Sequence, residues 1–129
     1  MRRCAWVLVF AALGCGAAAE WVIVTDHDEY IAYADPGTIL RDGERAQMRD
    51  LVDLKSARSS PFGNRHASSK AQSEFDCQNP RMRTIAFTLH SGQMGEGEIV
   101  ETLAESNGWL PVAPGTLLNR LRQFACSLL

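Results

Sequence analysis

The chain has few of the residues on which catalytic and metal sites are usually built. Among 129 residues it contains four cysteines and only three histidines, His27, His66 and His90. No cysteines form a CxxC motif, no cysteine has a histidine within a few residues, and no serine lies in a GxSxG motif. These absences argue against a thiol-redox protein, a structural zinc site and a serine hydrolase of the common type.

Long apolar runs are also missing after residue 20. The longest uncharged stretch, residues 4–19, follows Arg2 and Arg3 and ends in three alanines before Glu20. A positive start, an apolar centre and small residues at the end form a secretory signal peptide. The stretch is shorter than the roughly 20 apolar residues that span a bilayer. We therefore predict a cleaved signal peptide over residues 1–19; lipidation at Cys15 is a weaker alternative, because Ala12 stands where a lipoprotein box has leucine.

The predicted mature chain, residues 20–129, can bury one core and no more. Without Arg2 and Arg3, eleven Lys and Arg stand against fifteen Asp and Glu, which gives a net charge of −4. This acidic balance argues against nucleic acid as a partner, since nucleic acid favours a basic face. We expect a single domain over residues 20–129, without a transmembrane segment or a cofactor.

Two cysteines remain after the signal peptide, Cys77 and Cys126. An even pair in an exported chain is most simply a disulfide. Such a bridge closes a loop of about 50 residues, which the loop-entropy model values at roughly 4 kcal/mol. A metal pair or a redox pair is the alternative.

Alternating side chains and turn signals predict an antiparallel sheet. The expected strands are 21–25, 30–34, 38–41, 44–55, 66–77, 82–89 and 98–102, of which 44–55 has a helical alternative. The expected connections are a type II turn at 35–38, a hairpin turn at Asp42–Gly43, a loop at 57–65 and a flexible glycine-rich loop at 92–97.

The rest of the chain predicts what covers the sheet. Strand 66–77 alternates small residues on one side, which leaves room for Trp109 to pack there as core. Thr116 is a suitable cap for a helix from Leu117, whose apolar stripe needs a partner surface. The stripe consists of Leu117, Leu118, Leu121, Phe124, Ala125 and Leu128. We expect an α+β fold: an antiparallel meander of about six strands with a C-terminal helix packed on the sheet.

Several segments together are typical of one family. These are Tyr30–Asp35, the Glu-x-Asp-Cys segment 74–77, the Gly-x-Met-Gly-x-Gly loop 92–97, Trp109, and a last helix that ends near Cys126. The mature chain resembles the surface-adhesin protein E-like domain of small exported proteins of Gram-negative bacteria. The resemblance implies a helix tied to the sheet by a Cys77–Cys126 disulfide. It also implies a non-enzymatic protein of the periplasm or the cell surface.

Three functions follow as hypotheses. The first is a binding module for host or envelope proteins, with contacts from exposed aromatic residues among Tyr30, Tyr33 and Trp109. The second is a structural or assembly component of the envelope that associates with itself. The third and weakest is a metal-dependent hydrolase built on Asp26, His27, Asp28 and Glu29. Consecutive residues on a strand point to opposite sides, so these four side chains converge only in a tight loop.

Overall fold

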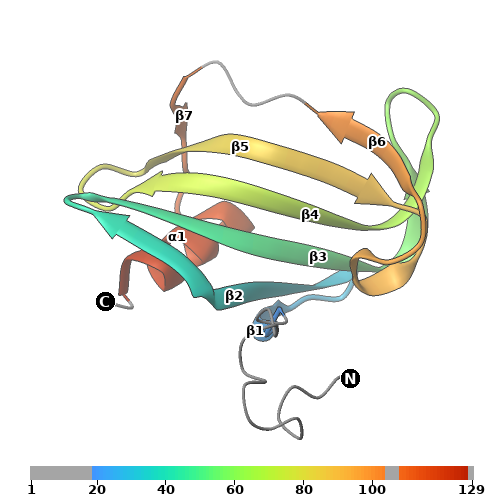
Figure 1. Cartoon of the computed structure of the whole chain (residues 1–129), viewed down its shortest axis with the longest axis horizontal. Helices are drawn as coiled ribbons and strands as arrows, with labels where there is room; N and C mark the ends of the chain where they lie inside the picture. Colours follow the sequence, from blue (N-terminus) through green and yellow to red (C-terminus); the bar gives the residue numbers. More distant parts are fainter. Residues whose placement is uncertain (1–18, 104–107, 128–129) are drawn as a thin grey trace, which may run out of the picture.

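The computed structural model describes residues 19–103 and 108–127, which form one antiparallel sheet and one α-helix (Figure 1). Strand order in the sheet follows chain order, and the two-residue β7 pairs with β5. The elements are β1 (Val22–Asp26), β2 (Tyr30–Asp42), β3 (Arg45–Ser59), β4 (Arg65–Asp76), β5 (Arg81–His90), the 3₁₀ turn η3 (Gln93–Gly95), β6 (Ile99–Leu103), β7 (Leu110–Pro111) and α1 (Leu117–Ser127). The predicted six-strand meander and C-terminal helix are confirmed, and the described chain is mostly sheet.

Residues 1–18 of the predicted signal peptide and Leu128 lie outside the described residues. In the described part, no helix combines the length and apolarity needed to cross a bilayer.

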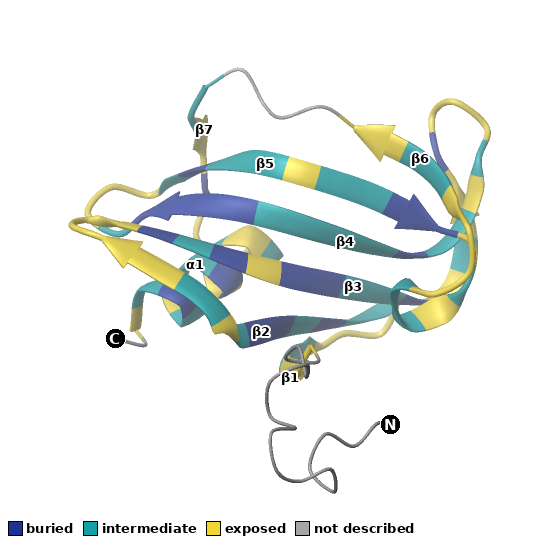
Figure 2. Ribbon diagram, in the orientation of Figure 1, coloured by how far each residue is buried: buried dark blue, intermediate teal, exposed yellow. Residues whose placement is uncertain are grey.

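The helix covers one end of the sheet on one face, which we call the helix face (Figure 1). Alternation along β3 and β4 places Met48 opposite Ser73 and Ala46 opposite Phe75 beneath it. From the helix, Leu121 and Ala125 are buried against this surface. The core cluster consists of Ala34, Ala46, Met48, Phe75, Met82, Val112, Leu121 and Ala125. Figure 2 shows this burial in the strand ends above the helix.

The ends of the helix follow the sequence expectation closely. The Thr116 hydroxyl accepts a hydrogen bond from the Asn119 backbone N–H at 3.2 Å, which is the predicted N-cap. Near the other end, Cys126 is bonded to Cys77, the residue after β4. The predicted disulfide is thus confirmed, and it ties the last helical turn to the sheet. One stripe residue differs, because Leu118 is 39% exposed instead of packed on the sheet.

Strand β2 is longer than predicted, because the expected type II turn at 35–38 does not occur. The chain runs on through Tyr30–Asp42, and its pairing with β3 shifts register between Asp35 and Leu40. Asp35 stabilises the irregularity by accepting the Gly37 N–H at 3.1 Å and, through its carbonyl, the Thr38 hydroxyl at 2.7 Å. Pro36 and Gly37 therefore form a bulge within a strand and not a turn between two strands. The predicted hairpin turn occurs one residue later than expected: Asp42 pairs with Arg45, and Gly43 and Glu44 form the turn, with a φ of 62° at Gly43.

The second end of the sheet is covered on the opposite face by the glycine-rich connector, residues 91–98. The predicted flexible loop is instead held by hydrogen bonds to β3 and β4. Met94 N–H donates to the Asp53 carboxylate at 2.7 Å, and Gly95 N–H donates to the Ser68 hydroxyl at 2.8 Å. The Ser68 hydroxyl in turn donates to the Gly92 carbonyl at 2.6 Å. The connector is thus a fixed part of that face.

Candidate functional site

The face opposite α1 carries most of the charged side chains of the central strands, and we call it the charged face. Successive cross-strand rows over β3, β4 and β5 follow from the register. The rows are Arg45–Asp76–Arg81, Gln47–Glu74–Arg83, Arg49–Gln72–Ala86, Leu51–Lys70–Thr88 and Asp53–Ser68–His90. Most side chains on this face, between β7 and the connector, are therefore polar; Leu51 and Ala86 are the apolar members of these rows.

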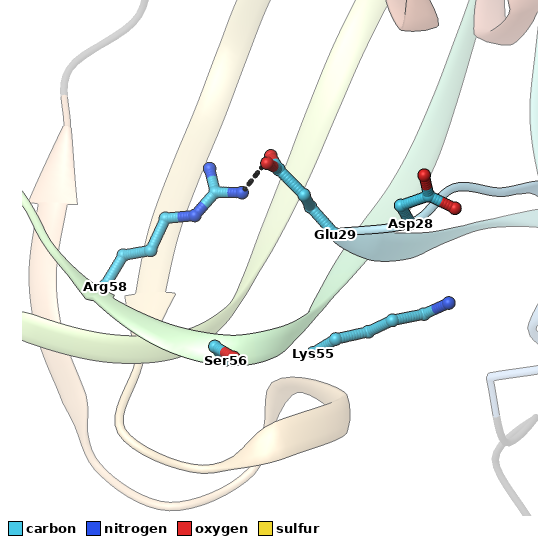
Figure 3. A pocket seen from close by; sticks show the side chains of 5 residues that line it. All are labelled: Asp28, Glu29, Lys55, Ser56 and Arg58. Atoms are coloured by element: carbon cyan, nitrogen blue, oxygen red, sulfur yellow. Dashed lines mark hydrogen bonds and ion pairs between the residues drawn. The ribbon is translucent and has the colours of Figure 1, made fainter.

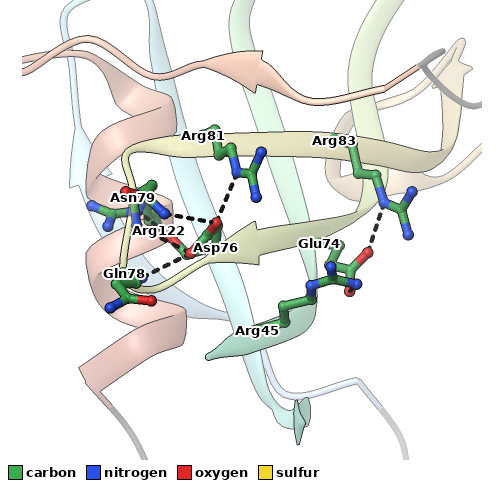
Figure 4. A network of polar contacts seen from close by, with 8 residues as sticks. All are labelled: Arg45, Glu74, Asp76, Gln78, Asn79, Arg81, Arg83 and Arg122. Atoms are coloured by element: carbon green, nitrogen blue, oxygen red, sulfur yellow. Dashed lines mark hydrogen bonds and ion pairs between the residues drawn. The ribbon is translucent and has the colours of Figure 1, made fainter. Parts of the chain in front are cut away.

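Two buried carboxylates organise the first rows (Figure 4). Arg81 Nε donates to Asp76 Oδ2 at 2.7 Å, and Arg83 Nε donates to Glu74 Oε1 at 2.7 Å. Asp76 Oδ1 also accepts the backbone N–H groups of Gln78 and Asn79. The Arg81 guanidinium and these N–H groups hold the pKa of Asp76 well below its usual range. Asp76 is thus a permanent anion that fixes the turn after β4.

Trp109 lies over three guanidinium groups of this network. The distances from the guanidinium carbons of Arg81, Arg83 and Arg45 to the ring centroid are 4.6, 5.1 and 5.4 Å. Each such contact contributes about 0.5–1 kcal/mol at an exposed site. The expectation that Trp109 is core is wrong: Trp109 is half-buried and sits on the charged face, not over the small residues of β4. Pairing of β7 with Arg81 and Met82 of β5 places it there.

The arginine–tryptophan cluster, defined as Arg45, Arg81, Arg83 and Trp109, was not found from the sequence. The sequence did contain one indication of the cluster: Arg81 and Arg83 are two residues apart, so in a strand their side chains lie on the same face of the sheet. Glu74 and Asp76 repeat that spacing on the preceding strand. Placing Trp109 above them requires the β5–β7 pairing, which a two-residue strand does not reveal.

A hollow lies beside the β1–β2 turn, and two of the four predicted metal ligands, Asp28 and Glu29, line it (Figure 3). Asp26 and Glu29 are paired with cations: Lys55 Nζ is 3.0 Å from Asp26 Oδ1, and Arg58 Nη2 is 3.0 Å from Glu29 Oε1. His27 Nδ1 accepts the Glu29 N–H, and its ring stacks on Tyr30 at 4.6 Å. Over the residues that the structure describes, no group of three His, Cys, Asp or Glu side chains could hold a metal ion.

The remaining predicted contact residues lie apart from the cluster. Tyr30 and Tyr33 belong to β2, and both are half-buried. Tyr33 pairs with Leu51 of β3, so it lies on the charged face, whereas Tyr30 pairs with Leu54 and lies on the helix face. The structure therefore does not bring Tyr30, Tyr33 and Trp109 together into one aromatic surface.

Comparisons with known proteins agree with this architecture. The family model for surface-adhesin protein E matches residues 21–127. The selenomethionine form of Haemophilus influenzae protein E is similar in fold, with a TM-score of 0.59 and 16% identity over 87% of this chain and 94% of that one. A second crystal form of that protein gives a TM-score of 0.58 and 17% identity over 86% and 97% of the two chains. No curated protein matches the sequence. With a family match over nearly the whole described region and the same fold in solved relatives, the chain belongs to the surface-adhesin protein E family.

Proposed function

We propose that this chain is an exported, non-enzymatic binding protein of the cell envelope. In this proposal it recognises a host or envelope protein through the charged face around Trp109. The observation that carries it is the arginine–tryptophan cluster: a half-buried indole on three guanidinium groups that are themselves 41–50% exposed at their side chains. Membership in the surface-adhesin family supports the same role. In this proposal the predicted signal peptide, residues 1–19, directs export.

The composition of the cluster is that of protein-interface hot spots. Tryptophan and arginine are the residues most enriched where truncation costs binding energy. Glu74 and Asp76 are buried and hold two of the arginines by their Nε atoms, so a partner meets guanidinium edges and the ring. Because the side chains are already held by ion pairs and ring contacts, less conformational entropy is lost on binding.

The test is direct binding of the purified mature chain to a panel of immobilised extracellular-matrix proteins, measured by biolayer interferometry. At least one protein should bind, and Trp109→Ala should weaken that binding about 30-fold, as expected for a hot-spot tryptophan. Phe62→Ala is the matched control, because Phe62 is an aromatic residue that is 77% exposed in the β3–β4 loop. Its affinity should be unchanged. Equal losses in both variants, or no binding to any protein of the panel, would refute an adhesin-like role at this face.

A structural or assembly role is the second candidate, and the sheet edges favour it. The edge strands β1 and β6 end the sheet, and each carries an exposed isoleucine: Ile23 is 57% exposed and Ile99 is 58% exposed. Exposed edges with apolar residues are templates for pairing with another chain.

Sedimentation equilibrium distinguishes the two functions. A mass that rises with concentration, and that Ile23→Lys returns to the monomer, supports self-association; a constant monomer mass excludes it.

A further inference from the structure

A shallow trough of about 280 Å³ lies on the charged face between the arginine–tryptophan cluster and the connector. Its polar lining comes from the third, fourth and fifth cross-strand rows. These residues are Arg49, Gln72, Lys70, Thr88 and His90, and Ile99 of β6 closes one side. The trough is thus built from four neighbouring strands of one rigid sheet.

Two of the lining residues are cations without an acidic partner. In residues 19–103 and 108–127, no carboxylate lies within ion-pair distance of the Arg49 guanidinium or the Lys70 ammonium group. Nor does either side chain take part in a hydrogen bond there. Of the carboxylates in the neighbouring rows, Glu74 is paired with Arg83, and Asp53 accepts the Met94 N–H of the connector. The lining of the trough itself holds two cations and no carboxylate, although the predicted mature chain is acidic.

The Lys70 side chain is held in place by the connector. A Cβ atom added to Gly95 would lie 2.9 Å from Lys70 Cδ and 3.1 Å from Cε, so the Lys70 stem runs directly against the Gly95 backbone. Gly95 has φ of 70°, which also favours glycine at this position. Because the connector is itself bound to Asp53 and Ser68, the Lys70 stem packs against a fixed segment of backbone.

His90 adds a polar ring that lacks one partner. It is 4% exposed, and its Nε2 lies 2.8 Å from the Thr88 hydroxyl. Its Nδ1 has no hydrogen-bond partner among the described residues. Burial and the Lys70 charge lower the pKa of His90, so the ring is neutral at pH 7 and adds no third positive charge to the trough. The unpartnered Nδ1 is buried and therefore carries a desolvation cost in the fold.

We propose that this trough binds a tetrahedral oxyanion, and that this oxyanion is a sulfate ester carried by a sulfated polysaccharide. Two unpaired cations and the Gln72 and Thr88 side chains match such a group, whose free oxygens can accept several charge-assisted hydrogen bonds at once. The trough is open along the sheet, so the sugar that carries the ester can remain outside it. This inference deepens the proposed function, on which it rests, by adding a polyanion subsite beside the protein-binding cluster.

The experiment is isothermal titration of the purified mature chain with three probes: inorganic sulfate, inorganic phosphate and a heparin-derived oligosaccharide. We expect the double variant Arg49→Gln, Lys70→Gln to bind the oligosaccharide at least about tenfold more weakly than the unmodified chain. The matched control is Lys55→Gln, Arg58→Gln, which removes the same number of charges from the β1–β2 hollow. It should bind within about twofold of the unmodified chain, since long-range charge effects are screened by salt. NMR of the His90 ring should show a shift on binding in the control and none in the trough variant.

Each outcome decides a separate point. Equal losses in the two double variants would mean diffuse attraction to positive charge and would overturn the site. Tighter binding of an acidic peptide such as oligoglutamate than of any probe would also overturn it. Binding of the inorganic ions alone would keep the oxyanion site but overturn the polysaccharide as its ligand. If Trp109→Ala abolishes protein binding while no anion binds, this inference fails and the proposed function stands.

Discussion

At the scale of single residues, the burial of Asp50 opposes folding. It lies on the helix face, paired across the sheet with Ala34 and Ala71, and is 5% exposed. Over the described part of the chain, its carboxyl group has no hydrogen bond or ion pair. Burial raises the pKa of Asp50 from its ordinary value of 3.8 to about 7. At neutral pH the protein therefore holds a carboxyl group that is only partly ionised.

The sign of the resulting pH dependence follows from the direction of this change. Between pH 4 and 7 the unfolded chain ionises Asp50 while the folded chain keeps its proton, so stability falls as pH rises. A pKa difference of this size corresponds to at most about 4 kcal/mol, fully lost above pH 7. We expect Asp50→Asn to raise the free energy of unfolding by about 1–4 kcal/mol at pH 8 and by less than about 1 kcal/mol at pH 4. Urea unfolding at both pH values measures it.

Asp76→Asn is the opposing control for that experiment. Because the pKa of Asp76 is depressed in the folded state, its contribution is present above its unfolded pKa and is lost as the solution is acidified. This variant should be destabilised at pH 8, where Asp50→Asn is stabilised. A stabilisation by Asp50→Asn that is equal at pH 4 and pH 8 would contradict the assignment of the cost to a buried charge.

At the scale of elements, the bond between β4 and α1 has the largest expected effect. The Cys77–Cys126 disulfide closes a loop with a sequence separation of 49 residues. The double variant Cys77→Ala, Cys126→Ala should lose about 2–5 kcal/mol of unfolding free energy. Thermal unfolding of the variant, compared with the oxidised and the reduced unmodified chain, measures the loss. If the variant unfolds at the same temperature as the oxidised chain, then the packing of Leu121 and Ala125 is sufficient to hold the helix on the sheet.

Element types were more predictable than the faces of the strands. The hairpin signal correctly predicted that β3 is a strand, although β3 runs to Ser59, four residues past the predicted end and into the expected loop at 57–65. Alternation predicted β4, and capping predicted the start of α1. In β5, strict alternation groups Arg83, Ile85, Phe87 and Leu89 together, but a register shift between Gln72 and Ser73 leaves Ile85 unpaired. As a result Met82 and Phe87 share the helix face, while Arg83 lies on the charged face. This bulge separates Arg83 from Phe87 and Leu89, which strict alternation places on the same face, and nothing in the local sequence marks its position.

At the scale of the whole molecule, net charge describes the surface poorly. Composition gives an acidic mature chain, which argues against nucleic acid as a partner. On the charged face, however, Glu74 and Asp76 are buried and paired while the arginines remain partly exposed. Composition averages over acidic residues elsewhere, such as the exposed Asp28 and Glu44, so it could not predict a locally positive trough.

Export is also a property of the whole molecule, and mass spectrometry of the intact native protein tests it. We expect a chain that begins at Glu20, lighter by residues 1–19 and by the two hydrogens lost when Cys77 and Cys126 are oxidised. The sample should come from the envelope fraction of cells that produce the full chain, with a cytosolic fraction as control. A product that keeps Met1, or a lipid mass on Cys15, would contradict the predicted cleavage.

Strand order that follows chain order has a consequence for assembly. Each strand pairs with the one made just before it, so the sheet can grow by successive local hairpins without waiting for distant segments. The helix is the last described element, and only its arrival shields Met48, Phe75 and Met82 from water. Once the last strand is in place and before the helix docks, the sheet leaves this apolar surface open to water, and in that interval the molecule is most prone to aggregate.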